Sequence, residues 1–402
     1  MLNLQKIQSA ADLLSTVVRN TAILDARGIT DDCSLYLKTE NLQHTGSFKL
    51  RGAFYKIASL SPEDRAKGVV ACSAGNHAQG VAFAAKHFGA SAKIFLPAGA
   101  PISKIEATRN RGAEVILIDG IYDDAYAASV KYAEENNIPF IHPFNDEDVI
   151  AGQGTVGLEI IEEIPDADAV VIPMGGGGLA AGMACAIKAL KPNCKVYGVQ
   201  AKGADSMVSS LHSGGIVSTK TVRTFADGIA VKSPGGLTLR LLKEFLDGSA
   251  TVDEDEIALA VLKLMEKQRL VAEGAGAVSV AAVMADKFGL AGKKVCAVVS
   301  GGNIDVNILS RVISRGLISE GRLTNLTVSL ADKPGQLEAV SKIIATGGAN
   351  VIGVQYTPGG EASRGEPQDI TGCYLKISME TRNFEHLTEI RTALSGNGFE
   401  LV

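Results

Sequence analysis

The sequence predicts an α/β protein whose body has two lobes built on parallel sheets, followed by a smaller α+β domain. The chain has 402 residues, which is more than one ordinary hydrophobic core accommodates. From about residue 35 to residue 300, short apolar runs alternate with longer helical patterns, as in sheets whose parallel strands are joined by helices. After Gly316 this alternation ends, and a different order of strands and helices follows.

The first series of alternating segments predicts a small lobe at about residues 35–145. Short β-branched runs bounded by glycine or proline are typical of buried strands. Four such runs occur here: GVVACSAG (68–75), AKIFLPAG (92–99), EVILIDG (114–120) and PFIHP (139–143). The longer stretches between them have the periodicity of helices: 76–89, 101–112 and 122–137.

The second series predicts a large lobe, with a ligand cleft between it and the small lobe. Its expected elements, in order, are a helix near TVGLEIIEEI (155–164), the strand AVVIPMG (169–175), the helix LAAGMACAIKAL (179–190), the strand KVYGVQA (195–201), the helix DEIALAVLKLMEKQRL (255–270) and the strand KVCAVVSGG (294–302). In open α/β sheets, ligands bind at the carboxyl ends of the strands.

Five clusters of glycine indicate where the backbone turns sharply or approaches a ligand, because glycine weakens regular helices and strands. They are AGNHAQG (74–80), GQGTVG (152–157), GGGG (175–178), EGAGA (273–277) and SGGN (300–303). Four of the five lie beside the expected carboxyl end of a strand or open the helix that follows one.

The C-terminal segment, residues 324–402, predicts a β-α-β-β-α-β unit, the ferredoxin-like arrangement. LISEGRLTNL (317–326) is expected to connect it to the body, which we place at residues 1–320. A strand, a turn, a helix and a strand follow, then a polar loop at 358–369, and finally a strand, a helix and a short strand. A small sheet domain joined to a catalytic body is most often regulatory or oligomerising.

Composition and charge argue against several classes of function. The net charge is −5 with both signs spread along the chain, which argues against binding to nucleic acid or to an anionic membrane surface. No apolar run approaches the ~18 residues needed to span a bilayer. The six cysteines are scattered without metal-binding spacing, so we expect buried, reduced thiols that are neither disulfides nor zinc ligands, in a cytoplasmic protein.

The run GGGG at 175–178 predicts a phosphate site. It follows an expected strand and opens a helix, so several backbone N–H groups can point at one anion. A dinucleotide fingerprint is the competing interpretation, because Gly176, Gly178 and Ala181 satisfy GxGxxA. That fingerprint also needs an acidic residue about 20 positions further on, where this chain offers Gln200. A monophosphate is therefore favoured.

A lysine in a cramped turn is the second feature that bears on the identity of the ligand. Lys49 lies in GSFKLRGA (46–53), between a Thr-Gly-Ser turn and small residues. Most lysines are solvated surface residues. Pyridoxal phosphate, however, needs both an amine for its aldehyde and an N–H cradle for its phosphate. Lys49 and the glycine run together predict this cofactor.

Seven motifs, in this order, resemble the fold-type II pyridoxal-phosphate enzymes and specifically the threonine dehydratases (threonine ammonia-lyases). They are SFKLRGA (47–53), SAGNHAQG (73–80), DVIAGQGT (148–155), PMGGGGL (173–179), FADGIAV (225–231), EGAGA (273–277) and SGGN (300–303). The resemblance covers essentially residues 5–320. LADKPGQL (330–337) resembles part of an ACT regulatory domain, as in the shorter ACT-bearing threonine dehydratases.

The resemblance implies a role for each site residue. Lys49 would bond covalently to the cofactor and, once freed, remove the α-proton of the substrate. Phe48 would pack on a face of the pyridine ring, and Asn76 would hydrogen-bond its phenolic oxygen. Ser300 would face the pyridine nitrogen, while Ser73 and the loop that holds Asn76 would receive the substrate carboxylate. The phosphate would be held by Gly175, Gly176, Gly177 and Gly178.

Several of these residues also have a purely structural interpretation. As the lesser alternatives, Asn76 would be only a helix N-cap, Ser300 a turn serine and Phe48 an ordinary core residue. His77 is as compatible with packing at a helix start as with a substrate contact. Glu273 either lines the cofactor cleft or caps a helix.

Two departures separate this chain from the serine racemases, which it resembles over the same motifs. In the racemases, a serine directly before the Gly-Asn of the asparagine loop acts on the second face of the ring; this chain has Ala74 there. The racemases also carry carboxylates at a divalent-cation site where this chain has Gln200, Ala204 and Ser206. We therefore expect elimination in preference to racemisation and assign no metal.

The expected activity is conversion of L-threonine to 2-oxobutanoate and ammonia, with L-serine to pyruvate as a secondary activity. A serine racemase, a serine-preferring dehydratase and a non-catalytic amino-acid sensor are the alternatives. The ACT-like domain is expected to bind an amino-acid effector, such as isoleucine, near Asp332 to Leu337 and across a subunit interface. A homodimer or homotetramer is expected.

Overall fold

A computed structural model describes residues 2–358 and 372–402 of the chain. The chain divides into two compact units, Met1–Leu309 and Ser310–Val402, and the division falls within the helix α13 (Val306–Ser319). The polar loop predicted at 358–369 lies outside the described residues from position 359 onward. The assignment of one part to catalysis and the other to regulation stays a prediction.

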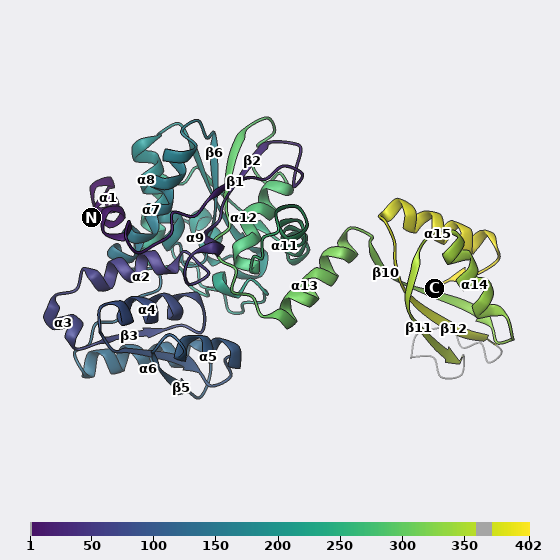
Figure 1. Cartoon of the computed structure of the whole chain (residues 1–402), viewed down its shortest axis with the longest axis horizontal. Helices are drawn as coiled ribbons and strands as arrows, with labels where there is room; N and C mark the ends of the chain where they lie inside the picture. Colours follow the sequence, from purple (N-terminus) through teal and green to yellow (C-terminus); the bar gives the residue numbers. More distant parts are fainter. Residues whose placement is uncertain (1, 359–371) are drawn as a thin grey trace. The chain divides into compact units, whose positions relative to one another are not determined.

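The small lobe of the first unit is a three-stranded parallel sheet between helices. Its strands, adjacent in the order given, are β3 (Val69–Cys72), β4 (Ala92–Pro97) and β5 (Glu114–Ile118). Its helices are α2 (Lys49–Ala58), α3 (Pro62–Ala66), α4 (Asn76–His87), α5 (Ile102–Arg109) and α6 (Tyr122–Glu135). Apolar residues of α2, α4 and α5 pack against one face of the sheet, and α6 covers the other (Figure 1).

One predicted strand of this lobe does not form. Phe140, in the run PFIHP, pairs with Val70 of β3 at a single isolated bridge. The Val70 N–H donates to Pro139 O at 2.9 Å, and the Ile141 N–H donates to Val70 O at 2.8 Å. Prolines at 139 and 143 lack the N–H group that a longer ladder needs, which accounts for the difference.

The large lobe contains a six-stranded sheet in the order β1-β2-β9-β6-β7-β8, parallel except for the antiparallel pair β1-β2. Its strands are β1 (Ile23–Asp25), β2 (Ser34–Lys38), β6 (Ala169–Pro173), β7 (Lys195–Ala201), β8 (Gly248–Val252) and β9 (Lys294–Val298). The sequence patterns predicted β6, β7 and β9 but missed β1, β2 and β8, of which β1 and β8 are edge strands.

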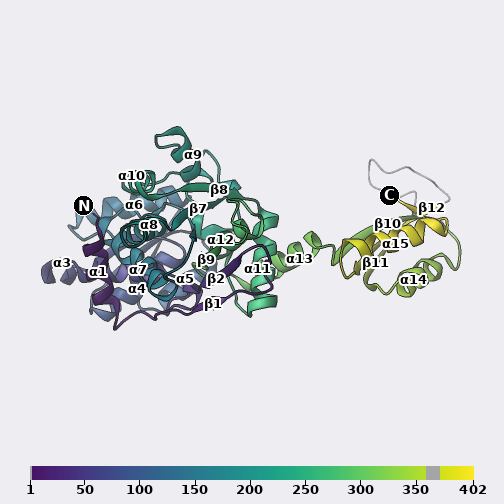
Figure 2. The same cartoon turned by 90° about the horizontal axis from the view of Figure 1, so that it is seen from above.

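Helices cover both faces of this sheet. They are α1 (Leu4–Leu14), α7 (Glu147–Glu163), α8 (Gly178–Leu190), α9 (Ser206–Ser213), α10 (Gly236–Phe245), α11 (Glu254–Gln268) and α12 (Gly274–Met284). The helix α12 packs along one face with α11 against it, whereas α8 and α7 lie on the other (Figure 1). In the view from above, α10 lies beside α8 (Figure 2).

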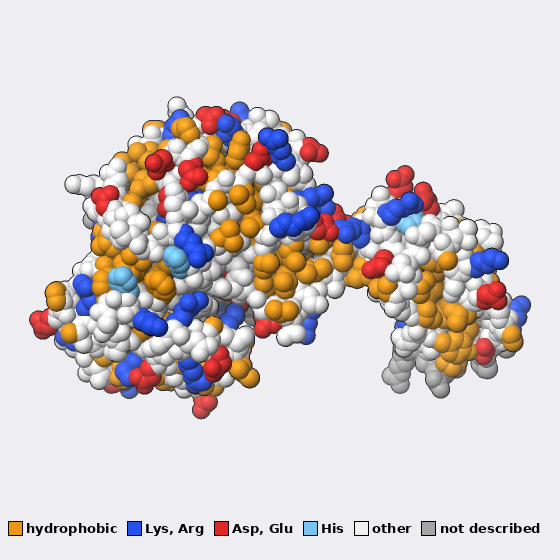
Figure 3. Space-filling view, in the orientation of Figure 1, with side chains coloured by type: hydrophobic (Ala, Val, Ile, Leu, Met, Phe, Trp, Pro, Cys, Tyr) orange, Lys and Arg blue, Asp and Glu red, His pale blue; other side chains and the backbone are white. Residues whose placement is uncertain are grey.

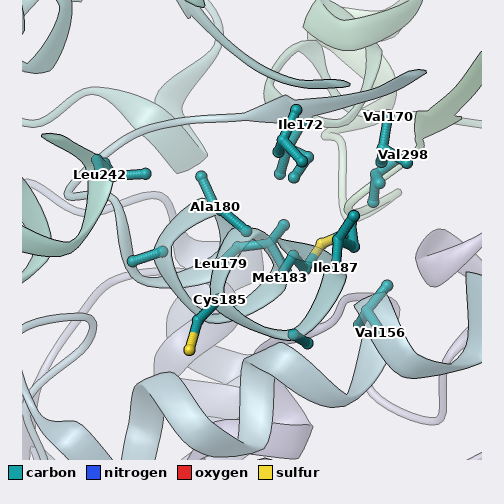
Figure 4. Close-up of a cluster of buried hydrophobic side chains, with 14 of the residues drawn as sticks. Val156, Val170, Ile172, Leu179, Ala180, Met183, Cys185, Ile187, Leu242 and Val298 are labelled. Atoms are coloured by element: carbon teal, nitrogen blue, oxygen red, sulfur yellow. The ribbon is translucent and has the colours of Figure 1, made fainter. Parts of the chain in front are cut away.

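The main hydrophobic core surrounds α8. Figure 4 shows side chains of α7, α8, α10, β6 and β9 meeting there, among them Val156, Ile172, Met183 and Val298. Every residue of α8 from Gly178 to Ile187 is buried. A helix that is buried all round needs apolar or small residues on every face, as the run LAAGMACAIKAL provides. The start of α8 is therefore firmly held.

The glycine cluster GQGTVG lies inside α7, which corrects the expectation that each cluster marks a bend or a ligand. A Cβ at Gly152 would lie 2.6 Å from the carbonyl oxygen of Arg51, and one at Gly154 would lie 2.8 Å from that of Gly182. These glycines allow α7 to pack closely against α2 and α8. The small-lobe helix α2 is thereby fixed against the large lobe.

The second unit is a four-stranded antiparallel sheet in the order β11-β12-β10-β13, with its core between the sheet and two helices. In chain order the elements are β10 (Leu323–Ala331), α14 (Gln336–Thr346), β11 (Asn350–Pro358), β12 (Gly372–Glu380), α15 (Phe384–Gly396) and β13 (Glu400–Leu401). This is the predicted β-α-β-β-α-β order. The predicted connector at 317–326 was too long, because α13 extends to Ser319 and β10 begins at Leu323.

Figure 3 shows both signs of charge on the surface. On this face of the first unit, acidic and basic side chains are mixed toward the upper and lower edges, and several basic side chains lie near the middle. Within residues 2–358 and 372–402, no helix is long and apolar enough to cross a membrane.

Candidate active site

A cavity of about 800 Å³ lies between the small and the large lobe. Its lining includes loops that follow three parallel strands: Ser73–His77 after β3, 175–179 after β6, and Ser300 with Asn303 after β9. Residues 227–236 also line it. Because α/β folds bind ligands at the carboxyl ends of their strands, this cavity is the candidate active site.

All the predicted site residues line this one cavity. They are Phe48, Lys49, Ser73, Asn76, Gly175, Gly176, Gly177, Gly178 and Ser300. The structure thus brings together residues from four separate motifs, although their individual roles stay predictions.

Lys49 begins α2 and lies beside the cavity. Its Nζ donates to Pro143 O at 2.8 Å and lies 5.2 Å from the ring centroid of Phe48. Burial between the lobes lowers the pKa of Lys49 to about 8, although the nearby carboxylate of Glu273 acts in the opposite direction. An appreciable fraction of this amine is therefore neutral close to neutral pH, as a nucleophile or a base requires.

The four glycines form a cradle at the start of α8. Gly177 has a left-handed backbone with φ 93°, and Gly178 is the first residue of the helix. A Cβ at Gly176 would lie 2.3 Å from the ring of Phe144, and one at Gly177 would lie 2.6 Å from Met207 Cε. Side chains are thus excluded here, while the first N–H groups of the helix have no partner within it. The cradle suits an anion.

Asn76 is not the N-cap of α4, so its purely structural interpretation was wrong. Gly75 occupies the cap position, and no side chain caps this helix. The Asn76 side chain instead donates from Nδ2 to Glu273 Oε1 at 2.6 Å. Its Oδ1 accepts from Asn303 Nδ2 at 2.8 Å. Asn76 is therefore held by residues of the large lobe.

The remaining predicted residues have modest contacts of their own. Ser73 Oγ accepts from the Gly75 N–H at 3.1 Å, which shapes the loop after β3. Ser300 is buried, and its Oγ donates to Ala275 O at a long 3.4 Å. Phe48 is half-buried and packs against the large-lobe core while it lines the cavity. Phe48 therefore also acts as a core residue, which was its structural interpretation.

His77 and Glu273, whose roles were left open, are both buried and both line the cavity. His77 Nε2 lies 2.8 Å from Ile141 O, so it carries the proton, and Nδ1 has no partner. Burial and the nearby Lys49 lower the pKa of His77 to about 3. Burial, with Asp227 adding to it, raises the pKa of Glu273 to about 7. Glu273 precedes α12 but its side chain does not cap it.

Sequence reasoning missed several residues of the cavity lining. Lys104 of α5 and Asp227 of the short helix η3 (Asp227–Ile229) form an ion pair that joins the two lobes. Asp227 lies in the motif FADGIAV, which could have pointed to it, whereas no sequence pattern marks Lys104. Asn303 ends the motif SGGN, yet nothing in the sequence indicated its contact with Asn76.

The positions of the racemase cation site are occupied by uncharged side chains with other partners. Gln200 Oε1 accepts from the Val208 N–H at 2.8 Å, and Ser206 Oγ donates to Val231 O at 2.8 Å. In the part of the chain that the structure describes, no group of three or more His, Cys, Asp or Glu side chains could hold a metal ion.

These features fit pyridoxal phosphate. A partly buried lysine of lowered pKa can react with an aldehyde, and the glycine cradle can take a phosphate that no side chain obstructs. Residues 14–301 match the family model described as pyridoxal-phosphate dependent enzyme. The chain belongs to this family. The family membership confirms the predicted cofactor.

Similarity to individual members of the family extends over most or all of the chain. The chain is 47% identical to an L-threonine ammonia-lyase of Thermotoga maritima, over 100% of this chain and 99% of that protein. The solved structure of processed threonine deaminase isoform 2 from Solanum lycopersicum matches with a TM-score of 0.75 and 37% identity, over 78% of this chain and 93% of that one. Maize serine racemase matches with a TM-score of 0.74 and 34% identity, over 79% and 98%. The predicted relationship of this pyridoxal-phosphate enzyme to threonine dehydratases is confirmed.

Proposed function

We propose that this pyridoxal-phosphate enzyme converts L-threonine to 2-oxobutanoate and ammonia by β-elimination, and L-serine to pyruvate as a secondary reaction. The observation that carries the proposal is one partly buried amine, Lys49, facing a cavity that Ala74, in the loop after β3, also lines. A methyl group cannot donate a proton to a second face of the substrate. The full-length similarity to an L-threonine ammonia-lyase supports the choice of substrate.

The chemistry then divides between the cofactor and the chain. Pyridoxal phosphate, when bound, supplies an aldehyde that captures amines and a ring that withdraws electrons from the α-carbon. Lys49, with its pKa of about 8, takes the α-proton of L-threonine. Loss of that proton lets the β-hydroxyl leave with the electrons of its carbon–oxygen bond, and the departing hydroxide takes up one proton, equivalent to the one removed by Lys49, and becomes water. Water converts the released enamine to 2-oxobutanoate and ammonia, so one water is lost and one is gained.

The other residues have binding roles in this proposal. The cradle Gly175–Gly178 would hold the phosphate, because no side chain caps the start of α8 and the first N–H groups of a helix have no partner within it. Phe48 would pack on the ring, and Ser300 would face the ring nitrogen without protonating it fully. Asn76 would donate to the phenolic oxygen, and Ser73 with its loop would receive the substrate carboxylate. These assignments rest on position in the cavity and on the motif resemblance.

A product assay on cofactor-loaded protein tests the reaction. L-Threonine, L-serine and D-serine are offered separately, and 2-oxo acid and chiral amino acid are followed together. Fast 2-oxobutanoate from L-threonine with no D-serine from L-serine is expected. Appreciable D-serine would instead favour the racemase alternative. The similarity to maize serine racemase is the reason for testing that alternative.

We also propose that an amino acid regulates the enzyme through the second unit, at Asp332 to Leu337. Asp332 hydrogen-bonds the hydroxyl of Tyr356 and raises the pKa of that tyrosine to about 12. Leu337, in the first turn of α14, and Tyr356, in β11, are each 50% exposed, so both offer apolar surface to an effector. Isoleucine is a candidate effector.

Binding of amino acids to the full chain tests this regulation. Asp332→Ala should weaken effector binding in calorimetry by about tenfold or more, since a charged hydrogen bond is worth roughly 1.5–3 kcal/mol. Glu385→Ala, on α15 of the same unit, is the matched control and should leave binding as it is. Equal effects of the two variants would contradict the proposed site.

Two further properties belong to this proposal. We propose a homo-oligomer, because Ile352, Val354 and Tyr356 on the edge strand β11 are about half exposed. Sedimentation showing a monomer would contradict it. We propose a cytoplasmic location, because all six cysteines are unpaired.

A further inference from the structure

Asn303 has no part in the proposed reaction, yet it lines the cavity and is hydrogen-bonded to Asn76. Its Nδ2 donates to Thr45 O at 2.7 Å and to Asn76 Oδ1 at 2.8 Å. Asn76 Nδ2 in turn donates to Glu273 Oε1 at 2.6 Å. The Thr45 carbonyl, the two amides and the carboxyl group therefore form one hydrogen-bonded chain.

The backbone carbonyl at one end of this chain determines the direction of every bond in it. A carbonyl only accepts, so the group of Asn303 that faces Thr45 must be the NH2. The same NH2 faces Asn76, which must therefore present its oxygen. The Asn76 nitrogen is consequently on the other side, where one N–H bonds Glu273. Its second N–H is left for a group in the cavity.

Close packing keeps the amides of this chain in place. A Cβ at Gly46 would lie 2.3 Å from Asn303 Oδ1, so only glycine leaves room for that amide. A Cβ at Gly301 would lie 2.3 Å from Glu273 Oε1 and 3.1 Å from Asn76 Nδ2. Reversing either amide would place two N–H groups or two oxygens against each other, in place of a donor and an acceptor. The loop SGGN therefore supplies both the space and the donor.

We propose that Asn303 is a positioning residue that holds the Asn76 amide so that its free N–H donates to the anionic oxygen of the cofactor. The inference rests on the role proposed above for Asn76. A reversed Asn76 amide would present its oxygen to that anion and repel it. Hydrogen bonds to an ionised acceptor are about twice as strong as neutral ones, so the orientation affects both cofactor affinity and the ionisation of that oxygen.

Titration of the full-length apoprotein with pyridoxal phosphate tests the inference, with the dissociation constant and the visible absorbance measured as functions of pH. Asn303→Ala should raise the dissociation constant roughly tenfold. It should also move the midpoint of the absorbance titration to higher pH, because an anion without its donor holds a proton more tightly. Asn303→Asp keeps the size but cannot donate to Thr45 O, and should show the same two changes.

Asn41 provides a matched control. It is a buried amide of the same region that donates to Val271 O at 3.0 Å and packs against Gly302, but it is not part of the cavity lining. Asn41→Ala should therefore leave the dissociation constant and the absorbance titration as in the wild type. Equal changes in Asn41→Ala and Asn303→Ala would mean that general loosening of this loop, and not orientation, explains the result, and would overturn the inference.

A double-mutant cycle separates this inference from the role of Asn76 itself. In an Asn76→Ala background, Asn303→Ala should have no further effect on either measurement, because Asn303 acts through Asn76. A full additional effect there would overturn the positioning role. If Asn76→Ala alone changed neither measurement, the proposed role of Asn76 and the inference would both fall. A change in Asn76→Ala with none in Asn303→Ala would overturn the inference alone.

Discussion

Lys49 and Arg51 lie two residues apart on α2, and burial has opposite consequences for their charges. For Lys49, burial lowers the pKa to about 8, and the side chain donates to a carbonyl oxygen. For Arg51, the effect of burial is outweighed by Glu40 and Glu159, which raise its pKa above the ordinary value. Burial penalises a cation unless carboxylates compensate for it. The partners, and not depth alone, distinguish a reactive amine from a structural cation.

The carboxylates around Arg51 tie the first turn of α2 to the large lobe. Arg51 Nη2 lies 2.8 Å from Glu40 Oε1, and Nη1 lies 2.6 Å from Glu159 Oε1. The buried Lys38 shares Glu159 at 2.7 Å. Successive residues of a helix are about 100° apart, so Lys49 and Arg51 project to nearly opposite sides of α2. One side of the same turn is thus anchored while the other meets the cavity.

Removing the reactive amine should have the largest effect. Lys49→Ala is expected to lower turnover of L-threonine by about 10³-fold or more, because a positioned base contributes roughly 10²–10⁴-fold and the covalent bond to the cofactor is also lost. Release of 2-oxo acid by protein free of host enzyme measures it. Lys56→Ala, on the same helix and paired with Asp146 at 2.8 Å, is the matched control and should retain turnover. Wild-type turnover in Lys49→Ala would remove the contrast between the two cations.

Breaking the compensation around Arg51 should act on stability. Arg51→Met is expected to lower the free energy of unfolding by about 3 kcal/mol, because Glu40 would remain buried without its partner. Urea denaturation followed by circular dichroism measures the change. Arg51→Met combined with Glu40→Gln should recover part of the loss, since no uncompensated charge stays buried. Equal losses in the single and the double variant would show that packing, and not charge, sets the effect.

A smaller, pH-dependent effect on stability is expected from Glu273. Burial and Asp227 raise its pKa from 4.5 to about 7, while Asn76, Lys104 and Lys49 act to lower it. Between these two values the folded protein holds a proton that the unfolded chain has released, so stability falls as the pH rises. Glu273→Gln removes this titration. The fall in unfolding free energy from about pH 5 to about pH 7.5 should then be smaller by about 2 kcal/mol. Identical declines in wild type and variant would contradict it.

Sequence patterns predicted the interior strands better than the rest of the fold. Strands such as β6 and β9 are buried on both faces, so each is a continuous apolar run that stands out in the sequence. The edge strand β1 has only three residues and gives no such signal. The run PFIHP was apolar enough to resemble a strand, but its prolines end the pairing after one bridge. The glycines of α7 resembled a ligand loop because close helix packing also requires glycine.

The sequence by itself determined which chemistry this protein is built for. A lysine in a tight turn and four glycines between a strand and a helix are local features, each contained within a few residues, so they can be recognised without a fold. Only the tertiary structure decided the state of these groups. The lowered pKa of Lys49 depends on burial between two lobes. The direction of the Asn76 amide depends on Glu273 and Asn303, which are separated from it by 197 and 227 positions in the sequence. Ionisation and hydrogen-bond direction arise from neighbours in space, which no stretch of sequence contains.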